Sequence, residues 1–497
     1  MSLIKINNVS RMFAGVEALK NVDITMEAGE IRTLAGENGS GKSTLIKIIS
    51  GVVKPDSGTI EINDKVYHNA TPIDMIQEGI QVIYQDFSVF PNLTAAENIA
   101  LNFELSNKKK LVNWKKVYEI ASDAISKINV NIDLTKRVEE LSVADKQLIA
   151  ISRALLNNAK LIIMDEPTTT LTRKEVHALF EIIRGLQKKG IAVLFVSHII
   201  DELFSVCEKI TILRNGERVY NGDLGDLDNN KLVYYMTGKT ISRDYYTKEH
   251  DVNETLLRVE NLNQKGGFRD ISFDLKESEI LGITGLLGSG RTSLAKALFG
   301  IKKADSGSIE IEGKPVRIDS VNSAIKNGIA YVPEDRLDEG LFLNQSIGSN
   351  IVISVIDRLL NRLKIVDKNS LKGIVDRSIL DLNIQTPSAH LPVKSLSGGN
   401  QQRVVLAKWL ATNPKIFVLN APTVGIDVGS KAEIYEIIRD LAKKGAGIII
   451  ISDDLPEVLH NCNRILVMKK GTIVAEFMST DVTEQQLQLK LSESESV

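Results

Sequence analysis

Short apolar runs recur along this chain, and segments with helical periodicity lie between them. Six runs are clearest: IRTLA (31–35), KLIIM (160–164), IAVLFV (191–196), EILGIT (279–284), KIFVL (415–419) and AGIIII (446–451). They are short, rich in β-branched residues and without polar alternation, which is typical of strands buried on both faces of a parallel sheet. Apolar positions at helical spacing predict amphipathic helices at 172–189 and 431–444. The alternation predicts an α/β sheet in each half of the chain.

Two longer segments, 94–158 and 347–413, are mostly helical in pattern. Each lies between strands of its own half and occupies the same place in the order of elements. We therefore expect one helical subdomain inserted into each α/β sheet.

An internal repeat organises the chain, because five motifs recur in the same order. The first two pairs are separated by 249 residues and the other three by 255: GENGSGKST with GLLGSGRTS, VIYQD with YVPED, ELSVADKQ with SLSGGNQQ, LIIMDEPTTTLT with IFVLNAPTVGID, and FVSHIIDEL with IISDDLPEV. The change of spacing places a net insertion of six residues between the second and third motifs of the second half. A repeat this long indicates two copies of one domain.

The repeat sets the expected domain boundaries. Length alone suggests about three domains, but the repeat favours a first domain at 1–240, a linker at 241–254, a second domain at 255–490 and a tail at 491–497. The polar stretch 238–255 has the composition of a linker.

The composition excludes several classes of protein but does not indicate a function. Lys and Arg number 61 and Asp and Glu 63, a net charge of −2, which gives no support for a nucleic-acid partner. The run Lys108–Lys110 is expected to be a solvated loop. The two cysteines, Cys207 and Cys462, are too few for a disulfide framework and are expected to be reduced thiols. We expect neither a signal peptide nor a membrane span, since no apolar run approaches 18 residues.

The first half contains a phosphate-binding motif, GENGSGKS at Gly36–Ser43. It follows a predicted strand and opens a helix, which is the context that separates such a loop from a chance glycine-rich turn. Backbone N–H groups and the helix N-terminus would bind phosphate oxygens. Lys42 would reach the β- and γ-phosphates, and Ser43 would bind Mg²⁺.

Two adjacent carboxylates, Asp165 and Glu166, follow the apolar strand LIIM. A carboxylate at the carboxyl end of a buried strand suits a Mg²⁺ site, and its neighbour could polarise an attacking water as general base. The alternative is an exposed acidic turn. Gln85 and His198 are candidate site residues only because each lies in one of the repeated motifs, since a single glutamine or histidine is more often structural.

These motifs resemble the ATP-binding cassette superfamily over nearly the whole chain. SLSGGNQQ is similar to the signature loop of that family. The resemblance implies that each copy has an α/β core, an antiparallel β portion and a helical subdomain. It also implies that Gln85 is the Q-loop glutamine and a metal ligand, His198 the switch histidine and Phe13 the aromatic that stacks on adenine. Cassettes of this type pair head to tail, with each ATP held between one phosphate loop and the opposite signature loop.

Paired copies would form two composite sites. The first joins the catalytic residues Gln85, Glu166 and His198 and the Mg²⁺ ligands Ser43, Gln85 and Asp165 to ATP-binding residues from both copies: Phe13, Gly36, Glu37, Asn38, Gly39, Ser40, Gly41, Lys42, Ser43, Thr44, Ser397, Gly398, Gly399 and Asn400. The second contains Gly288, Ser289, Gly290, Arg291, Thr292 and Ser293 opposite Ser142.

The second composite site departs from the pattern of the family. Arg291 replaces the lysine, and Asn420 and Ala421 replace the Asp–Glu pair, so the general base is missing. Losing a general base typically removes about 10²–10⁴-fold in rate. Glu334 and Asp453 place negative charge near the phosphates, and the opposing signature, LSVADKQ, also departs from the family pattern. We expect efficient hydrolysis only at the first site. The second either binds nucleotide without cleaving it efficiently or is a scaffold that supplies SLSGGNQQ.

The tandem arrangement, VPEDR at Val332–Arg336 and PTVGIDVG resemble the ATPase subunits of bacterial monosaccharide importers of the second carbohydrate-uptake class. The resemblance implies a peripheral subunit at the cytoplasmic face of the membrane, with integral-membrane permease subunits, two in number, as direct partners and an extracytoplasmic solute-binding protein as an indirect one. The carried solute is left open. The alternative is a soluble twin-cassette translation factor, which usually has a long charged arm and two intact sites.

Overall fold

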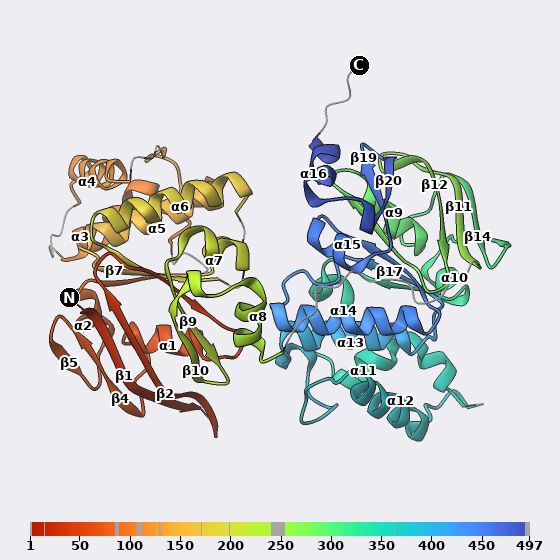
Figure 1. Ribbon diagram of the computed structural model, residues 1–497, viewed down its shortest axis with the longest axis horizontal. Coiled ribbons are helices and arrows are strands. Elements are labelled where there is room, and N and C mark those ends of the chain that lie inside the picture. Colours follow the sequence, from red (N-terminus) through yellow and green to blue (C-terminus); the bar gives the residue numbers. More distant parts are fainter. Residues whose placement is uncertain are drawn as a thin grey trace, which may run out of the picture. The chain divides into compact units, whose positions relative to one another are not determined.

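The computed structural model describes residues 2–13, 15–84, 89–106, 112–128, 130, 132–169, 171–197, 199–239, 254–361 and 363–492. The chain forms two compact units, Met1–Ile241 and Ser242–Val497, each with its own hydrophobic core (Figure 1). In the described ranges, no helix has both the length and the apolar character needed to cross a bilayer.

The first unit contains two sheets. A four-stranded antiparallel sheet has the order β2-β1-β4-β5 and comprises β1 (Ser2–Phe13), β2 (Val16–Glu27), β4 (Ser57–Ile62) and β5 (Lys65–Tyr67). A six-stranded sheet has the order β10-β9-β3-β8-β7-β6 and comprises β3 (Ile31–Ala35), β6 (Ile80–Ile83), β7 (Leu161–Asp165), β8 (Ala192–Val196), β9 (Lys209–Arg214) and β10 (Glu217–Asp223). All neighbours in this sheet run parallel except β9 and β10.

The helices of the first unit fall into a core set and an inserted set. The core set is α1 (Lys42–Ile49), α2 (Pro72–Gln77), α6 (Arg173–Lys188), α7 (Ile200–Val206) and α8 (Asn229–Thr237). The inserted set is α3 (Ala95–Ser106), α4 (Trp114–Ser126) and α5 (Val143–Leu156), whose apolar faces share a separate cluster. The predicted helical subdomain is therefore present in this unit.

The second unit repeats both sheets in the same order. The antiparallel sheet β12-β11-β14-β15 comprises β11 (Thr255–Gln264), β12 (Phe268–Lys276), β14 (Ser306–Ile311) and β15 (Lys314–Val316). The six-stranded sheet β20-β19-β13-β18-β17-β16 comprises β13 (Ile280–Gly285), β16 (Ile329–Val332), β17 (Ile416–Asn420), β18 (Gly447–Ile451), β19 (Arg464–Lys469) and β20 (Thr472–Met478).

The helices of the second unit are α9 (Arg291–Leu298), α10 (Val321–Lys326), α11 (Ile347–Val352), α12 (Lys368–Asp381), α13 (Gly398–Leu410), α14 (Val428–Lys443), α15 (Leu455–Asn461) and α16 (Glu484–Ser492). A π-helical turn, η3 (Arg336–Gly340), precedes α11, and a 3-10 segment, η4 (Ile353–Leu359), follows it. The net six-residue insertion predicted for this half falls between the second and third motifs, which is the part of the unit that contains α11, η4 and α12.

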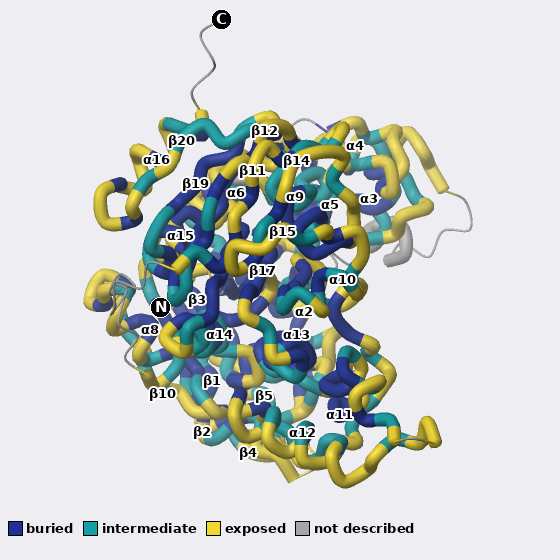
Figure 2. Tube along the Cα trace, turned by 90° about the vertical axis from the view of Figure 1, so that its right-hand side faces the viewer, coloured by how far each residue is buried: buried dark blue, intermediate teal, exposed yellow. Residues whose placement is uncertain are grey.

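Burial explains the apolar runs that the sequence displays. All residues of β3, β8, β17 and β18 are buried, and the central strands are dark in Figure 2. All six predicted strands are confirmed to within one residue at each end. One boundary is different: α16 continues to Ser492, and Leu491 is buried in the core. The first two residues of the expected tail therefore belong to the second unit.

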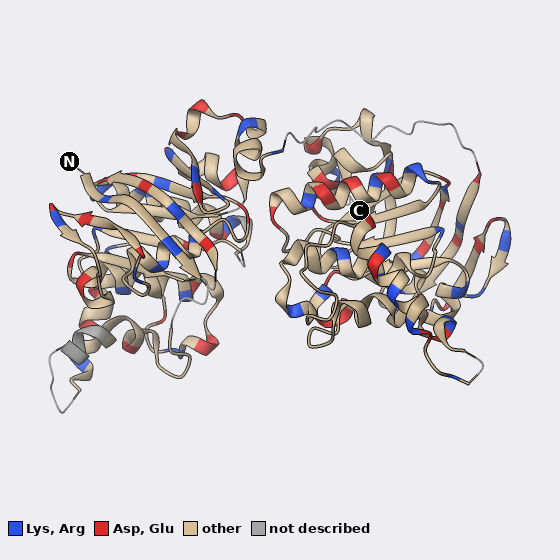
Figure 3. Cartoon of the chain, turned by 90° about the horizontal axis from the view of Figure 1, so that it is seen from below, with Lys and Arg blue, Asp and Glu red and all other residues tan. Residues whose placement is uncertain are grey.

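Basic and acidic residues are interspersed over both units. In the view of Figure 3, Lys and Arg are interspersed with Asp and Glu along the described chain. This distribution agrees with the near-zero net charge of the sequence.

Candidate functional site

The loop of 36–41 joins β3 to α1 and has the backbone of a phosphate cradle. Gly36 and Gly41 have φ angles of 147° and 106°, which side chains of L-residues rarely allow. A Cβ at Gly36 would lie 2.2 Å from the carbonyl oxygen of Leu213, and one at Gly41 would lie 2.6 Å from that of Ala18. Both glycines are therefore required by the close approach of neighbouring backbone.

Lys42 is held over this loop. It is only 8% exposed, and its Nζ donates to the carbonyl oxygens of Gly36 and Glu37, each at 2.8 Å. No side chain caps the N-terminus of α1, so the helix presents its first N–H groups at the loop. Asn38 and Ser43 are exposed at its rim, and Thr44 is half-buried.

Asp165 ends β7, beside the phosphate loop. Burial raises the pKa of its carboxyl, repulsion by Glu166 raises it further, and the charges of Lys42 and Lys47 lower it. Because the Lys42 ammonium lowers this pKa, the two charges are close enough to interact. A half-buried carboxylate close to a cationic phosphate loop is the arrangement that a bound divalent cation would stabilise.

Glu166 occupies a left-handed turn directly after β7. Its φ is 49°, and its N–H donates to the carbonyl oxygen of Val196 at 2.9 Å, which ties the turn to β8. Such a backbone conformation costs roughly 1 kcal/mol for a residue other than glycine. The strained turn holds the Glu166 side chain at the carboxyl edge of the sheet.

Of the remaining residues predicted for this part of the first site, the structure describes Phe13. Phe13, at the end of β1, is 43% exposed, and the Arg11 guanidinium lies 4.7 Å from its ring centre. Gln85 and His198 lie outside the described residues, as do Lys108–Lys110.

The signature loop of the second unit begins α13. Ser397 is the N-cap, and its Oγ accepts from the Asn400 side chain at 3.0 Å. A Cβ at Gly399 would lie 2.3 Å from the Oγ of Ser430 and 2.5 Å from its Cβ, so α13 packs directly on the start of α14. One at Gly398 would lie 2.8 Å from Nη2 of Arg336. The two glycines thus permit close packing on both sides of the turn.

The corresponding loop of the first unit is built differently. Ser142 caps α5, but its hydroxyl lies 2.8 Å from the Asp145 carboxylate. Val143 and Ala144 stand in place of the two glycines, and Asp145 in place of Asn400. This helix start therefore presents a carboxylate, which repels phosphate, where α13 presents a neutral amide.

The second phosphate loop keeps the backbone of the first. Gly288 and Gly290 have φ angles of 82° and 95°, and Ser289 is buried. Thr292 and Ser293 follow in the first turn of α9 and are half-buried. The change is at Arg291, whose guanidinium lies 3.2 Å from the Asp453 carboxylate. The cation of this loop is thus paired with a carboxylate of its own unit.

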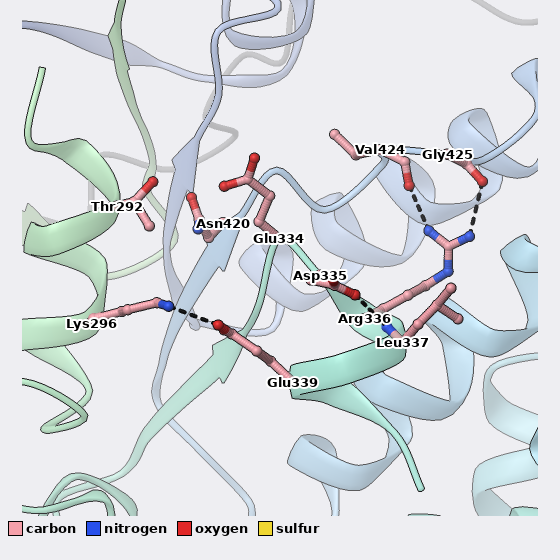
Figure 4. Close-up of a pocket in the computed structure, with 10 residues that line it drawn as sticks. All are labelled: Thr292, Lys296, Glu334, Asp335, Arg336, Leu337, Glu339, Asn420, Val424 and Gly425. Atoms are coloured by element: carbon pink, nitrogen blue, oxygen red, sulfur yellow. Dashed lines mark hydrogen bonds and ion pairs between the residues drawn. The ribbon is translucent and has the colours of Figure 1, made fainter. Parts of the chain in front are cut away.

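A pocket of about 480 Å³ adjoins this loop (Figure 4). Thr292 and Asn420 lie on one side of it, and Val424 and Gly425 lie near Arg336. Its remaining lining residues come mainly from η3 and from the segment before it: Lys296, Glu334, Asp335, Leu337 and Glu339. The pocket thus connects the second phosphate loop to η3.

Comparison with known proteins agrees with this geometry. A family profile described as "ABC transporter" matches residues 19–169 and 268–424. The chain belongs to the ABC transporter family. It is 42% identical over 491 residues, 99% of this chain and 98% of the relative, to the ribose import ATP-binding protein RbsA of Clostridium perfringens, and 36% identical over 484 residues, 97% and 98% of the two chains, to the protein of that name in Bacillus subtilis.

A solved ATP-binding cassette of an ABC transporter, in its ADP conformation, is 26% identical, with a TM-score of 0.44 and coverage of 48% of this chain and 100% of that one. The family profile matches twice. The two profile matches, one in each unit, confirm the predicted architecture of two tandem ATP-binding cassettes, and the chain is a nucleotide-binding ATPase.

Sequence patterns alone did not predict three features of these two ABC cassettes. The Arg291–Asp453 ion pair joins residues more than 160 positions apart. Ala421 keeps the left-handed turn of Glu166, with a φ of 48° and an N–H that donates to Ile451 at 2.7 Å. Phe13 ends β1, but the corresponding turn of the second unit, between β11 and β12, contains no aromatic residue. Comparing the sequences of the two turns would have revealed this difference.

Proposed function

We propose that this chain is the ATP-hydrolysing subunit of an importer, with one competent composite ATP site and one impaired site. The observation that carries the proposal is the contrast between the two β-strand ends. Asp165, within the field of Lys42, ends β7 and Glu166 follows it, whereas Asn420 ends β17 and Ala421 follows it in the same left-handed turn. The strand ends differ in chemistry and share their geometry.

At the competent site, each unit contributes what the other lacks. The N–H groups of 36–41 and Lys42 bind the β- and γ-phosphates, and Phe13 stacks on adenine. Ser397, Gly398, Gly399 and Asn400 bind the γ-phosphate from the opposite side. Glu166 polarises the attacking water, with His198 and Gln85 completing the set. The capped start of α13 suits this role, because its helix N-terminus and neutral Asn400 favour an anion.

The residues present also fit Mg²⁺. The donor set of Ser43, Asp165 and Gln85 consists of oxygen ligands, which this cation prefers. Asp165 is a half-buried carboxylate whose pKa is raised by burial, so a cation nearby would stabilise its charge. Bound there, the ion would neutralise the charge of the β- and γ-phosphates. Lys42 supplies further positive charge near this carboxylate.

At the second site, Gly288, Ser289, Gly290, Arg291, Thr292 and Ser293 form a loop that retains nucleotide affinity but lacks a base. The Arg291–Asp453 pair lowers that affinity, since phosphate must compete with a carboxylate for the guanidinium. Ser142 faces this site in a signature that carries Asp145. Binding without efficient cleavage is therefore the role we favour, with a purely structural role as the alternative.

The solute and the partners are inferred from the relatives. Full-length similarity to ribose import ATP-binding proteins supports import of a monosaccharide or related small solute. The direct partners are two integral-membrane permease subunits at the cytoplasmic face of the membrane, and the indirect one is an extracytoplasmic solute-binding protein. Contact with the membrane is only through the permease. The comparisons do not support the translation-factor alternative. We assign cassettes to 1–240 and 255–492, joined by a linker at 241–254; the second ends with α16, two residues beyond the boundary predicted from the sequence.

The test is Glu166→Gln in the transporter assembled with its permease. This substitution keeps the size of the side chain and removes the base, and we expect ATPase activity to fall by at least about 100-fold. Nucleotide binding, measured with a fluorescent ATP analogue, should persist. The matched control is Ala421→Gln at the equivalent turn of the second unit, which should leave activity near wild type. Substantial ATPase activity in Glu166→Gln would refute the single-competent-site proposal.

A further inference from the structure

Arg336 connects three segments of the second unit. It begins η3, and its guanidinium donates to the carbonyl oxygens of Val424 at 2.6 Å and Gly425 at 3.0 Å (Figure 4). Its Nη2 occupies the space where a side chain at Gly398 would lie. One planar group therefore packs between η3, the loop after β17 and the signature turn at the start of α13.

Further contacts hold η3 to its surroundings. At its end, Nζ of the buried Lys408 of α13 donates to the carbonyl oxygen of Gly340 at 2.6 Å. In its middle, Glu339 pairs with Lys296 of α9 at 2.8 Å. The turn is thus attached both to the helix that follows the second phosphate loop and to the helix that begins with the signature.

The internal repeat supplies an independent observation. The positions of Arg336, Gly398 and Gly425 correspond in the first half to Phe87, Val143 and Thr170. Gly425 has a φ of 66°, a conformation that a threonine rarely adopts, and this turn directs its carbonyl at the guanidinium. All three positions differ together, and only the half with the intact signature has the arginine and both glycines.

We propose that Arg336 is a positioning residue for hydrolysis at the first site. It fixes the signature turn, Ser397–Gly399, in the geometry that receives the γ-phosphate, although it lies in the pocket of the second unit. A ligand that displaces η3 in this pocket would therefore alter turnover at the first site. The inference rests on the proposed function, because it assumes that this signature completes the first site.

Arg336 would act by fixing the orientation of the signature turn. A guanidinium bonded to two carbonyls resists rotation, whereas a lysine ammonium is a single charge on a flexible stem. A displacement of about 1 Å at a positioned group can cost about 100-fold in rate. Loss of Arg336 should therefore lower kcat more than it changes KM.

The experiment compares Arg336→Gln and Arg336→Lys in the full chain assembled with its permease. We expect kcat to fall by roughly 10- to 100-fold in Arg336→Gln and by less in Arg336→Lys, with KM and the affinity for a fluorescent ATP analogue within about threefold of wild type. The control is Arg317→Gln, an exposed arginine of the same unit, which should behave as wild type. An unchanged kcat in Arg336→Gln would overturn the inference.

A double-mutant cycle separates positioning from general loss of structure. Gly398→Ala would place a Cβ 2.8 Å from Nη2 of Arg336 and 3.0 Å from the carbonyl oxygen of Gly425, and it should lower kcat. Only the first contact is lost in the Arg336→Gln background, so the substitution should cost several-fold less there. Additive effects would contradict the proposal. If Arg336→Gln unfolds the second unit, Arg336→Lys decides, since a stable variant with wild-type kcat would overturn the inference. If Glu166→Gln is inactive and Arg336→Gln is fully active, only this inference fails; an active Glu166→Gln rejects the proposed function first.

Discussion

Replacing Gly399 by alanine tests whether the packing of α13 on α14 sets the signature geometry. The added Cβ would lie 2.5 Å from the Cβ of Ser430, whereas ordinary contact begins at 3.4 Å, so the two helix starts must separate by about 0.9 Å. Because Ser397 and Gly398 move with the helix, a displacement of about 1 Å should lower kcat by about 100-fold. Overpacking should also cost about 1–3 kcal/mol of stability.

The assay combines steady-state ATPase kinetics of the assembled transporter with thermal unfolding of the full chain. A unit of this size loses about 2–4 °C in Tm per kcal/mol. Ser430→Gly removes both crowding atoms, so the double variant Gly399→Ala/Ser430→Gly should regain most of the activity. Gly373→Ala is the matched control, since a Cβ there meets nothing within 4 Å. Wild-type kcat in Gly399→Ala, or no recovery in the double variant, would refute the packing argument.

Three further variants probe the two sites and the second core. Ser397→Arg should reduce ATPase activity nearly as much as loss of the base, because it blocks the first site from the other unit; activity above about a tenth of wild type would contradict this. Asp453→Asn in a Lys42→Ala background should raise the affinity of the second loop for a fluorescent ATP analogue by up to about fivefold. The ion pair of Arg291 with the exposed Asp453 is worth at most about 1 kcal/mol, which sets this limit. Fluorescence titration measures the affinity, and an unchanged value would argue against competition between Asp453 and phosphate. Burial lowers the pKa of Lys408 from 10.5 to about 8, so between these pH values the unfolded chain binds more protons than the folded one. The free energy of unfolding should therefore rise by roughly 3 kcal/mol as the pH increases from about 8 to 10.5. Denaturant unfolding should show this rise in the wild type but not in Lys408→Met.

Hydrophobic periodicity and the spacing of the repeated motifs were sufficient to predict most of the fold. The strands β3, β8 and β18 are buried on both faces, so their sequences lack alternation and could be located directly. The repeat spacing located the second copy of every motif, and the phosphate loops lie where the motifs place them. Local order along the chain was sufficient because these features depend on residues close in sequence.

Contacts between distant segments could not be predicted in the same way. The pairing of Arg291 with Asp453 depends on how β18 is set beside β13, and either residue alone is compatible with an exposed charge. The role of Arg336 depends on two backbone carbonyls, which carry no sequence signal. The sequence places Leu491 in the tail, whereas in the structure it is a buried residue in the last turn of α16.

The left-handed turn at Ala421 bears on how the two units diverged. The backbone bond to Ile451 and the φ angle match those at Glu166, although alanine gains nothing from the strain. A glycine would relieve roughly 1 kcal/mol there. The backbone of this turn is therefore the same whether its side chain is a carboxylate or a methyl group. Under the proposed function, giving the second site a base would require new side chains on a turn that is already formed.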